Sequence, residues 1–310
     1  MGEHRDSGHS PAARALNRVL AVAAILLALV VLAGAAAVFL ATRKYRDMAA
    51  AAKMGDYLAV RCFLLRGASP NARDHESYQP LHWAAFYNHT KIVERLLRHG
   101  ADIDGKDGAD WTPLGLAARN DSREAAELLI ARGADLNARN KYGYTPLANA
   151  VVNGKTNTAK LLLAAGADFR IRTAEGDTPL HCTARNGWRD TVRLLIAAGA
   201  EADLHVAAAL NDVPRIQRFL AEGADVNTRD TTAKTPLHFA AWWRSKEAAE
   251  LLIAKGADVN AEDREGTTPL RIARYGSANP VVDILVRHGA REESATPKGA
   301  LAPSPFSPFP

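Results

Sequence analysis

Gln79-Pro80-Leu81-His82 is a phrase that returns three times, as Thr112-Pro113-Leu114-Gly115, Thr145-Pro146-Leu147-Ala148 and Thr178-Pro179-Leu180-His181. Each copy begins 33 residues after the one before it. A second phrase, Gly100-Ala101-Asp102, recurs at the same spacing through Gly199-Ala200-Glu201. Two phrases that stay in register over four copies indicate a row of stacked repeats, in which each unit packs only on its neighbours.

Each unit carries the signals of two helices. The proline of the first phrase suits the first turn of a helix, where its missing N–H would have had no partner, and the preceding threonine can cap that turn. Runs such as 92–97 and 125–130 place apolar residues three and four apart, which predicts a second helix with one buried face. The glycine after each run is free to take the positive φ with which many helices end.

A 33-residue unit with a Thr-Pro-Leu-His phrase resembles the ankyrin family. The resemblance covers residues 47–290 and implies an all-α solenoid of about eight units, each a β-turn finger followed by two antiparallel helices. It also implies that His82, His181, His205 and His238 hold the turns by hydrogen bonds and do not bind metal. The expected units start near residues 47, 79, 112, 145, 178, 202, 235 and 268.

The end units and the sixth unit depart from the pattern. The first unit lacks the Thr-Pro opening, and the last carries Arg274 in place of a small residue, which is typical of caps that face water. In the sixth unit, Leu204 follows Leu180 by 24 residues instead of 33, so nine residues are missing (33 − 24) where the finger should be. We therefore expect a gap in the row of fingers and a bend between the fifth and sixth units.

An uncharged apolar run occupies residues 19–42, after a polar segment at 1–18. As a helix, these 24 residues span about 36 Å, more than the bilayer core of about 30 Å. Arg43-Lys44-Tyr45-Arg46 follows with charge and an interfacial aromatic residue. We expect a membrane-spanning helix. The alternatives are a signal peptide cleaved near residues 33–37 and a buried helix of a soluble domain.

Charge leaves the orientation of such a helix open, because three Lys or Arg residues lie within fifteen residues before the run and four after it. The whole chain has a net charge of +5, from 39 basic and 34 acidic residues, and a solvated mixed-charge surface explains this as well as an anionic partner does. We expect no nucleic-acid partner. The tail at 291–310 is rich in Pro, Ser and Ala and is expected to be disordered.

No pattern of residues points to catalysis. The sequence contains no phosphate-binding loop, and no metal-ligand spacing or nucleophile with a neighbouring base stands out. Cys62 and Cys182 lie in the first and fifth units, too far apart in a stacked array to pair. We expect a protein that is not an enzyme, that holds no cofactor or metal, and that takes no small-molecule substrate.

The resemblance implies that partners contact the finger tips and the two residues after the small pair of each first helix. Exposed aromatic residues and arginines at such positions dominate binding energy at protein interfaces. The predicted contact residues are Tyr78, Phe86, Tyr87, Trp111, Arg119, Tyr142, Tyr144, Arg185, Trp242 and Trp243. The alternative is that some of these rings pack on neighbouring fingers, or that Trp242 and Trp243 fill the gap left by the short sixth unit.

The sequence thus predicts a non-enzymatic scaffold that binds a partner protein and is tethered to a membrane by residues 19–42. Its Ala- and Arg-rich usage indicates a bacterial source, and hence a single-pass protein of the inner membrane. One alternative is an exported periplasmic protein that protects or regulates an envelope enzyme. Another is an enzyme with an unfamiliar site.

Overall fold

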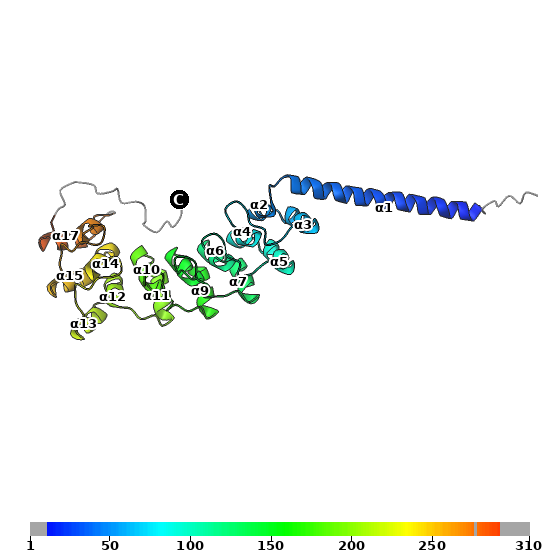
Figure 1. Cartoon of the computed structure of the whole chain (residues 1–310). Coiled ribbons are helices and arrows are strands. Elements are labelled where there is room, and N and C mark those ends of the chain that lie inside the picture. Colours follow the sequence, from blue (N-terminus) through cyan, green and yellow to red (C-terminus); the bar gives the residue numbers. More distant parts are fainter. Residues whose placement is uncertain (1–10, 276–277, 292–310) are drawn as a thin grey trace, which may run out of the picture.

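A long helix and a curved row of helix pairs make up the protein (Figure 1). The structure is a computed structural model that describes residues 11–275 and 278–291. The long helix, α1 (Pro11–Arg43), projects from the row, and no strand occurs in the described ranges. The expectations for residues 1–10 and for the Pro-rich tail at 292–310 lie outside these ranges.

The described residues after α1 form eight helix pairs, joined by turns and by fingers. In chain order, the pairs are α2 (Met48–Lys53) with α3 (Tyr57–Leu65), α4 (Pro80–Phe86) with α5 (Thr90–Arg98), α6 (Pro113–Arg119) with α7 (Arg123–Ala131), α8 (Pro146–Val152) with α9 (Thr156–Ala164), α10 (Pro179–Asn186) with α11 (Arg189–Ala197), α12 (Leu204–Leu210) with α13 (Val213–Ala221), α14 (Pro236–Trp243) with α15 (Lys246–Ala254), and α16 (Pro269–Ala273) with α17 (Val281–Arg287).

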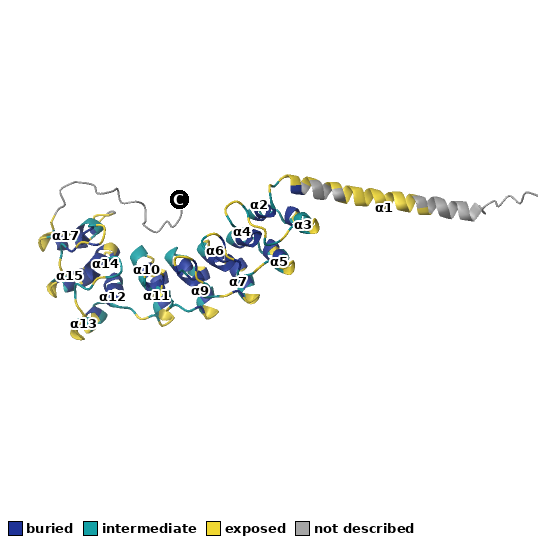
Figure 2. Ribbon diagram, viewed as in Figure 1, coloured by how far each residue is buried: buried dark blue, intermediate teal, exposed yellow. Residues whose placement is uncertain are grey.

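The repeated phrase starts the first helix of its unit as expected. In α6 and α8 the threonine hydroxyl accepts the backbone N–H three residues on, with Thr112 and Thr145 each 3.2 Å from the nitrogen. The proline at the first helical position needs no such partner. The leucine of the phrase, as in Leu114, is fully buried between neighbouring units. Figure 2 shows buried residues on the helix pairs all along the array.

The histidines of the phrase hold neighbouring fingers, as the resemblance implied. His82 accepts the N–H of Gln79 on Nδ1 (3.2 Å), and its Nε2 donates to the carbonyl of Trp111 in the next finger (2.9 Å). His238 makes the same pair of bonds with Thr235 (3.0 Å) and Thr267 (3.0 Å). In each ring Nδ1 accepts a hydrogen bond and Nε2 donates one, as a neutral imidazole does. Burial lowers the pKa of both rings, that of His238 to about 4.

The sixth unit lacks its finger, and the histidine of the fifth unit has a different partner as a result. His181 Nε2 lies 2.9 Å from the carboxylate of Asp203, the residue directly before α12. Asp203 also caps α12 by accepting the N–H of Val206 (3.0 Å). Burial alone would raise the pKa of Asp203, but hydrogen bonds and charge from His181 and His205 hold it well below its usual value.

His205 differs from His82 and His238 in its hydrogen-bond partners. Its Nδ1 lies 3.2 Å from the Asp203 carboxylate and its Nε2 lies 3.1 Å from the carbonyl of Lys234. Both neighbours only accept hydrogen bonds, so these contacts favour the doubly protonated, charged form of the ring. Accordingly, Asp203 raises the pKa of His205 even though burial opposes this.

The missing finger also divides the core. One apolar cluster runs from Met48 to Leu195 and takes in a few residues of the sixth and seventh units, and a second runs from Leu204 to Leu285. Figure 1 shows the row of pairs changing direction between α11 and α12, as the short unit predicted. At the far end Arg274 is exposed, in agreement with a terminal cap.

Helix α1 meets the array at its carboxyl end, where Arg66 of the α3 C-terminus donates to the hydroxyl of Thr42 (2.7 Å). The side chains at 11–19, 21, 35, 37–39 and 41 are outside the description, and they include part of the expected membrane helix at 19–42. Among the residues that are described, no helical stretch has the length and apolar character needed to cross a bilayer.

Candidate protein-binding surface

Four aromatic side chains of the second unit form a cluster around Trp83, which is named here the Trp83 cluster: Tyr78, Trp83, Phe86 and Tyr87. The ring centroids of Tyr78 and Tyr87 lie 4.6 and 6.1 Å from that of Trp83, and Phe86 meets it edge to face at 6.5 Å. Tyr87 is the exposed member, with 41% of its surface accessible. The cluster therefore offers one accessible ring on a rigid aromatic base.

Two polar contacts fix Trp83 in this cluster. Its indole N–H donates to Asp74 (2.7 Å), and Lys53 of the first unit lies with its ammonium group 3.9 Å from the ring centroid. Trp83 was not among the predicted contact residues. It lies at the fourth position of α4, and the aligned residues of two other units, Leu116 and Val206, are buried, so the repeat pattern marks this position as core.

Trp111 corrects the expectation that every finger aromatic is accessible, because only 3% of it is exposed. Its ring lies over Gly115, where a Cβ would come within 3.2 Å of the indole. Gly115 replaces the histidine of the phrase, so the ring occupies space that a side chain would otherwise take. Trp111 also lies 6.5 Å from Tyr144, whose pKa burial raises.

The remaining candidates of the third and fourth units lie at or near the surface. Tyr142 is 49% exposed, and its carbonyl accepts the N–H of Ala174 in the next finger (2.9 Å). Tyr144 is half-buried. Arg119 is half-buried too, and its charge acts on Tyr78, whose pKa is raised because burial outweighs it. Arg119 is therefore near enough to Tyr78 for its charge to act on the phenol.

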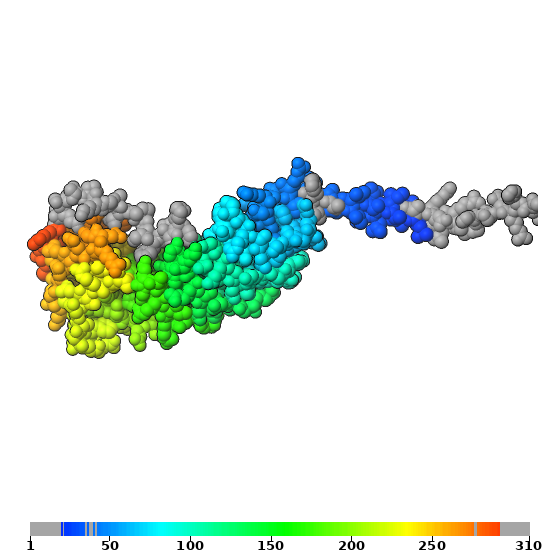
Figure 3. All heavy atoms as spheres, viewed as in Figure 1, coloured from blue at the N-terminus to red at the C-terminus, as the bar shows by residue number. Residues whose placement is uncertain are grey.

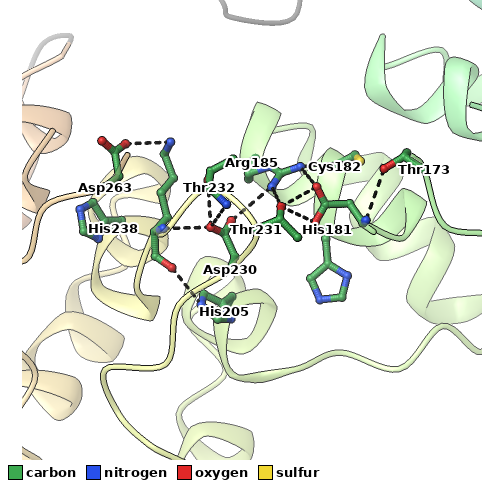
Figure 4. A network of polar contacts seen from close by, with 12 residues as sticks. Thr173, His181, Cys182, Arg185, His205, Asp230, Thr231, Thr232, His238 and Asp263 are labelled. Carbon is green, nitrogen blue, oxygen red and sulfur yellow. Dashed lines mark hydrogen bonds and ion pairs between the residues drawn. The ribbon is translucent and has the colours of Figure 1, made fainter. Parts of the chain in front are cut away.

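Arg185 is the second correction, because only 3% of its side chain is exposed. It forms an ion pair with Asp177 of its own finger and lies 3.4 Å from Asp230 in the finger of the seventh unit. It also donates to the hydroxyl of Thr231 (2.8 Å). Figure 4 shows the guanidinium of Arg185 directed toward Thr231 and Asp230.

Other groups complete this bridge across the gap. The Thr231 hydroxyl donates to Asp177 (2.8 Å), so the two fingers are joined directly as well as through Arg185. Burial would raise the pKa of Asp230, but hydrogen bonds from Thr232 and Lys234, with the Arg185 charge, hold it below its usual value. Cys182 lies 3.9 Å from the Arg185 guanidinium, and burial raises the pKa of its thiol to about 12, so it stays protonated at neutral pH.

Trp243 is the third correction, with 5% of its surface exposed. Its indole N–H donates to the carbonyl of Ala184 in the fifth unit (2.6 Å), and the guanidinium of Arg189 lies 4.8 Å from its ring centroid. Trp243 therefore packs against the fifth unit from the seventh. Of the two alternatives that the sequence left open, the structure favours gap filling for this residue.

Trp242, the residue before it, is 40% exposed. Its ring lies against Gly187 of the fifth unit, where a Cβ would come within 2.8 Å of the indole nitrogen. It lies 6.1 Å from Tyr275 of the eighth unit, which is 54% exposed. Trp242 and Tyr275 thus form a second accessible aromatic surface.

Comparison with protein families agrees with this architecture. The family model described as "Ankyrin repeats (3 copies)" matches residues 48–140, 133–203 and 204–295. The chain belongs to the ankyrin repeat family. The boundary between the last two matches, at 203 and 204, coincides with the missing finger of this ankyrin array. A search of curated proteins found no match.

Ankyrin repeats generally form protein-interaction modules, and this array has surfaces suited to that use. Trp188 adds a further accessible ring that sequence reasoning missed. It is 45% exposed, lies on Gly154 and donates to the carbonyl of Val152 (2.9 Å). It stands directly before α11, at a position where six of the other seven units carry Asp, Ser, His or Lys, and an aromatic residue among polar ones was the available signal. In the described part of the array, no group of three His, Cys, Asp or Glu side chains is placed to hold a metal ion.

Proposed function

We propose that this protein is a scaffold that binds a partner protein on the finger and first-helix face of its array and is tethered to a membrane through α1. The observation that carries the first part is the set of accessible aromatic side chains supported by packed neighbours, above all Tyr87 on the Trp83 cluster and Tyr142 on its finger. Rigid, half-accessible rings bind with little loss of side-chain entropy.

Changing Tyr87 and Tyr142 together to alanine is expected to weaken partner capture at least tenfold. Each ring at the centre of an interface typically contributes more than 1 kcal/mol, and a factor of ten corresponds to about 1.4 kcal/mol. The thermal transition should move by only a few degrees, because both side chains are substantially exposed. Quantitative co-purification after crosslinking in the native host measures partner capture. Circular dichroism measures the thermal transition.

The matched control changes Leu58 and Val286 to alanine, because these residues are 63% and 47% exposed on second helices of their pairs. If this control reduces capture as much as the tyrosine variant, the aromatic face is not the binding surface. A variant of Trp242 and Tyr275 compares the second aromatic surface in the same assay. If only the Trp242 and Tyr275 variant loses capture, the interface lies on the carboxyl-terminal units instead.

The tether rests on the exposed apolar surface of α1. The helix projects from the array in Figure 3, and Ile25, Leu27 and Val30 are 59, 66 and 69% exposed. Leu20 and Leu40, near the two ends of the run, are 58 and 66% exposed. Soluble proteins rarely leave such a contiguous apolar surface uncovered, and a lipid bilayer would cover all sides of a single helix at once.

The tether is tested by the mass and extraction of the protein from membranes of its host, taken as bacterial. A full-length mass that resists alkaline carbonate supports the tether, and protease added outside the inner membrane then shows on which side the array lies. A chain shorter by about 35 residues would instead support an exported periplasmic protein, since small-residue cleavage sites end near that position. A full-length chain released by carbonate would contradict both.

A further inference from the structure

The junction between α1 and the array holds a cavity of about 470 Å³. Its walls are formed by Thr42, Arg43, Tyr45, Arg46, Phe63 and Arg66, together with the turn at 67–68. This volume falls within the usual range of small-ligand sites. Three of the lining residues are arginines and none is acidic, so the cavity is cationic.

The charges of Arg46 and Arg66 are not cancelled by the acidic residues nearest to them in the chain. The carboxyl ends of α1 and α3 contribute about half a negative charge each, against the guanidinium groups of Arg46 and Arg66. The two nearest acidic residues in the chain, Asp47 and Asp56, accept the N–H groups that cap α2 and α3, at 2.8 and 2.9 Å. Asp56 also pairs with Lys44 (3.7 Å), so this carboxylate does not neutralise an arginine of the cavity.

Arg66 is positioned by a neutral partner. Its Nη1 donates to the Thr42 hydroxyl at 2.7 Å, which orients the guanidinium and leaves its charge in place. Among the described residues, neither Arg66 nor Arg46 has a carboxylate within the 4.0 Å of an ion pair. Planar guanidinium groups match the oxygens of phosphate with two parallel hydrogen bonds, and they do so better than an ammonium group.

The position of the cavity along α1 selects the source of the phosphate. Leu40 is 66% exposed, and Arg43, three residues further on, lines the cavity. The rise of a helix places these two residues only about 4.5 Å apart along its axis. Tyr45 and Phe63 add aromatic walls, which suit the boundary between headgroups and acyl chains. If α1 is the tether, the cavity lies at the depth of lipid phosphates.

We propose that this cavity between α1 and α3 binds the phosphate group of an anionic phospholipid. The assignment to lipid rests on the proposed tether, whereas the recognition of phosphate rests on the cavity itself. Bound lipid would join α1 to the first unit and so fix the array relative to the membrane surface.

The test uses the full chain in nanodiscs of phosphatidylcholine mixed with phosphatidylglycerol, and native mass spectrometry measures which lipid stays bound after release from the disc. The intact chain should retain phosphatidylglycerol in preference to phosphatidylcholine. Changing Arg46 and Arg66 to glutamine should lower that preference about 30-fold, the effect of two basic residues near an anionic surface. Arg46→Gln alone, at an exposed side chain, should lower it about fivefold without disturbing the fold.

The matched control changes two exposed arginines far along the chain from α1, Arg132 directly after α7 and Arg193 in α11, to glutamine, and should leave the preference unchanged. An equal loss in this control would overturn the site, because net charge alone would then explain binding. A second arm titrates inorganic phosphate into the lipid-free chain. The chain could bind inorganic phosphate, lose that binding on Arg46→Gln and Arg66→Gln, and yet show no preference for phosphatidylglycerol. That result would support a phosphate site and overturn its assignment to lipid. If the arginine variants lose binding in neither arm, the proposal is overturned, and this holds whatever carbonate extraction shows for the tether.

Discussion

Replacing Arg185 with leucine is expected to lower the free energy of unfolding of the array by about 3–5 kcal/mol. The change leaves the side chains of Asp177 and Asp230, which are 4 and 5% exposed, buried without their cation. It also removes the donor to Thr231 and so cuts the bridge across the missing finger. Urea unfolding followed by circular dichroism measures the loss.

The unfolding curve should also change shape. Repeat arrays are stabilised by contacts between neighbours, so a weakened interface allows the two sides to unfold separately. We expect a second transition, and hydrogen exchange should show faster opening of units six to eight. A triple variant that adds Asp177→Asn and Asp230→Asn should recover part of the loss, because the uncompensated charges are gone.

The control for this prediction is Arg98→Leu, which removes an exposed ion pair with Glu94 on one helix. Such pairs contribute at most about 0.5 kcal/mol. If Arg185→Leu is no more destabilising than Arg98→Leu, the contacts of Arg185 across the missing finger do not stabilise the array.

The second large effect is expected from Trp243→Ala, at about 3–5 kcal/mol. The side chain is 5% exposed and packs from the seventh unit onto the fifth, so its loss opens a cavity beside the short sixth unit. Trp243→Phe keeps most of the ring but loses the bond to the Ala184 carbonyl, and should cost about 1 kcal/mol or somewhat more. Thermal and urea unfolding of the three proteins give the comparison.

Trp242→Ala is the paired control, because this neighbouring ring is 40% exposed. It should destabilise the array clearly less than Trp243→Ala does. Any loss of partner capture is expected from Trp242→Ala and not from Trp243→Ala. Equal destabilisation by the two changes would mean that both rings fill the gap and that Trp242 is not part of a binding surface.

The candidate surface was only partly predictable, for reasons visible at single residues. Tyr87, Tyr142 and Trp242 are exposed at positions where the repeat predicted contact residues. Trp111 is buried because Gly115 leaves room for its ring, a compensation between two positions that the phrase does not encode. Trp83 escaped prediction because its position is core in most other units.

The sequence by itself determined the elements and their order. The Thr-Pro-Leu phrase carries its own cap and first turn, and the apolar spacing carries the buried face of the second helix, so these features depend on residues within one unit. The count of 24 residues between Leu180 and Leu204 also located the missing finger, because a finger needs residues to build it.

Only the tertiary structure decided how that gap is closed. The contacts from Arg185 to Thr231 and from Trp243 to Ala184 join residues 46 and 59 positions apart, and they skip the sixth unit. The repeat specifies contacts between nearest neighbours, whereas these arise because two fingers and two helix ends approach once the intervening finger is absent. Arg185 and Trp243, which the sequence predicted to be surface residues, are therefore buried. Closing the gap removes their side chains from water and brings hydrogen-bond partners to them.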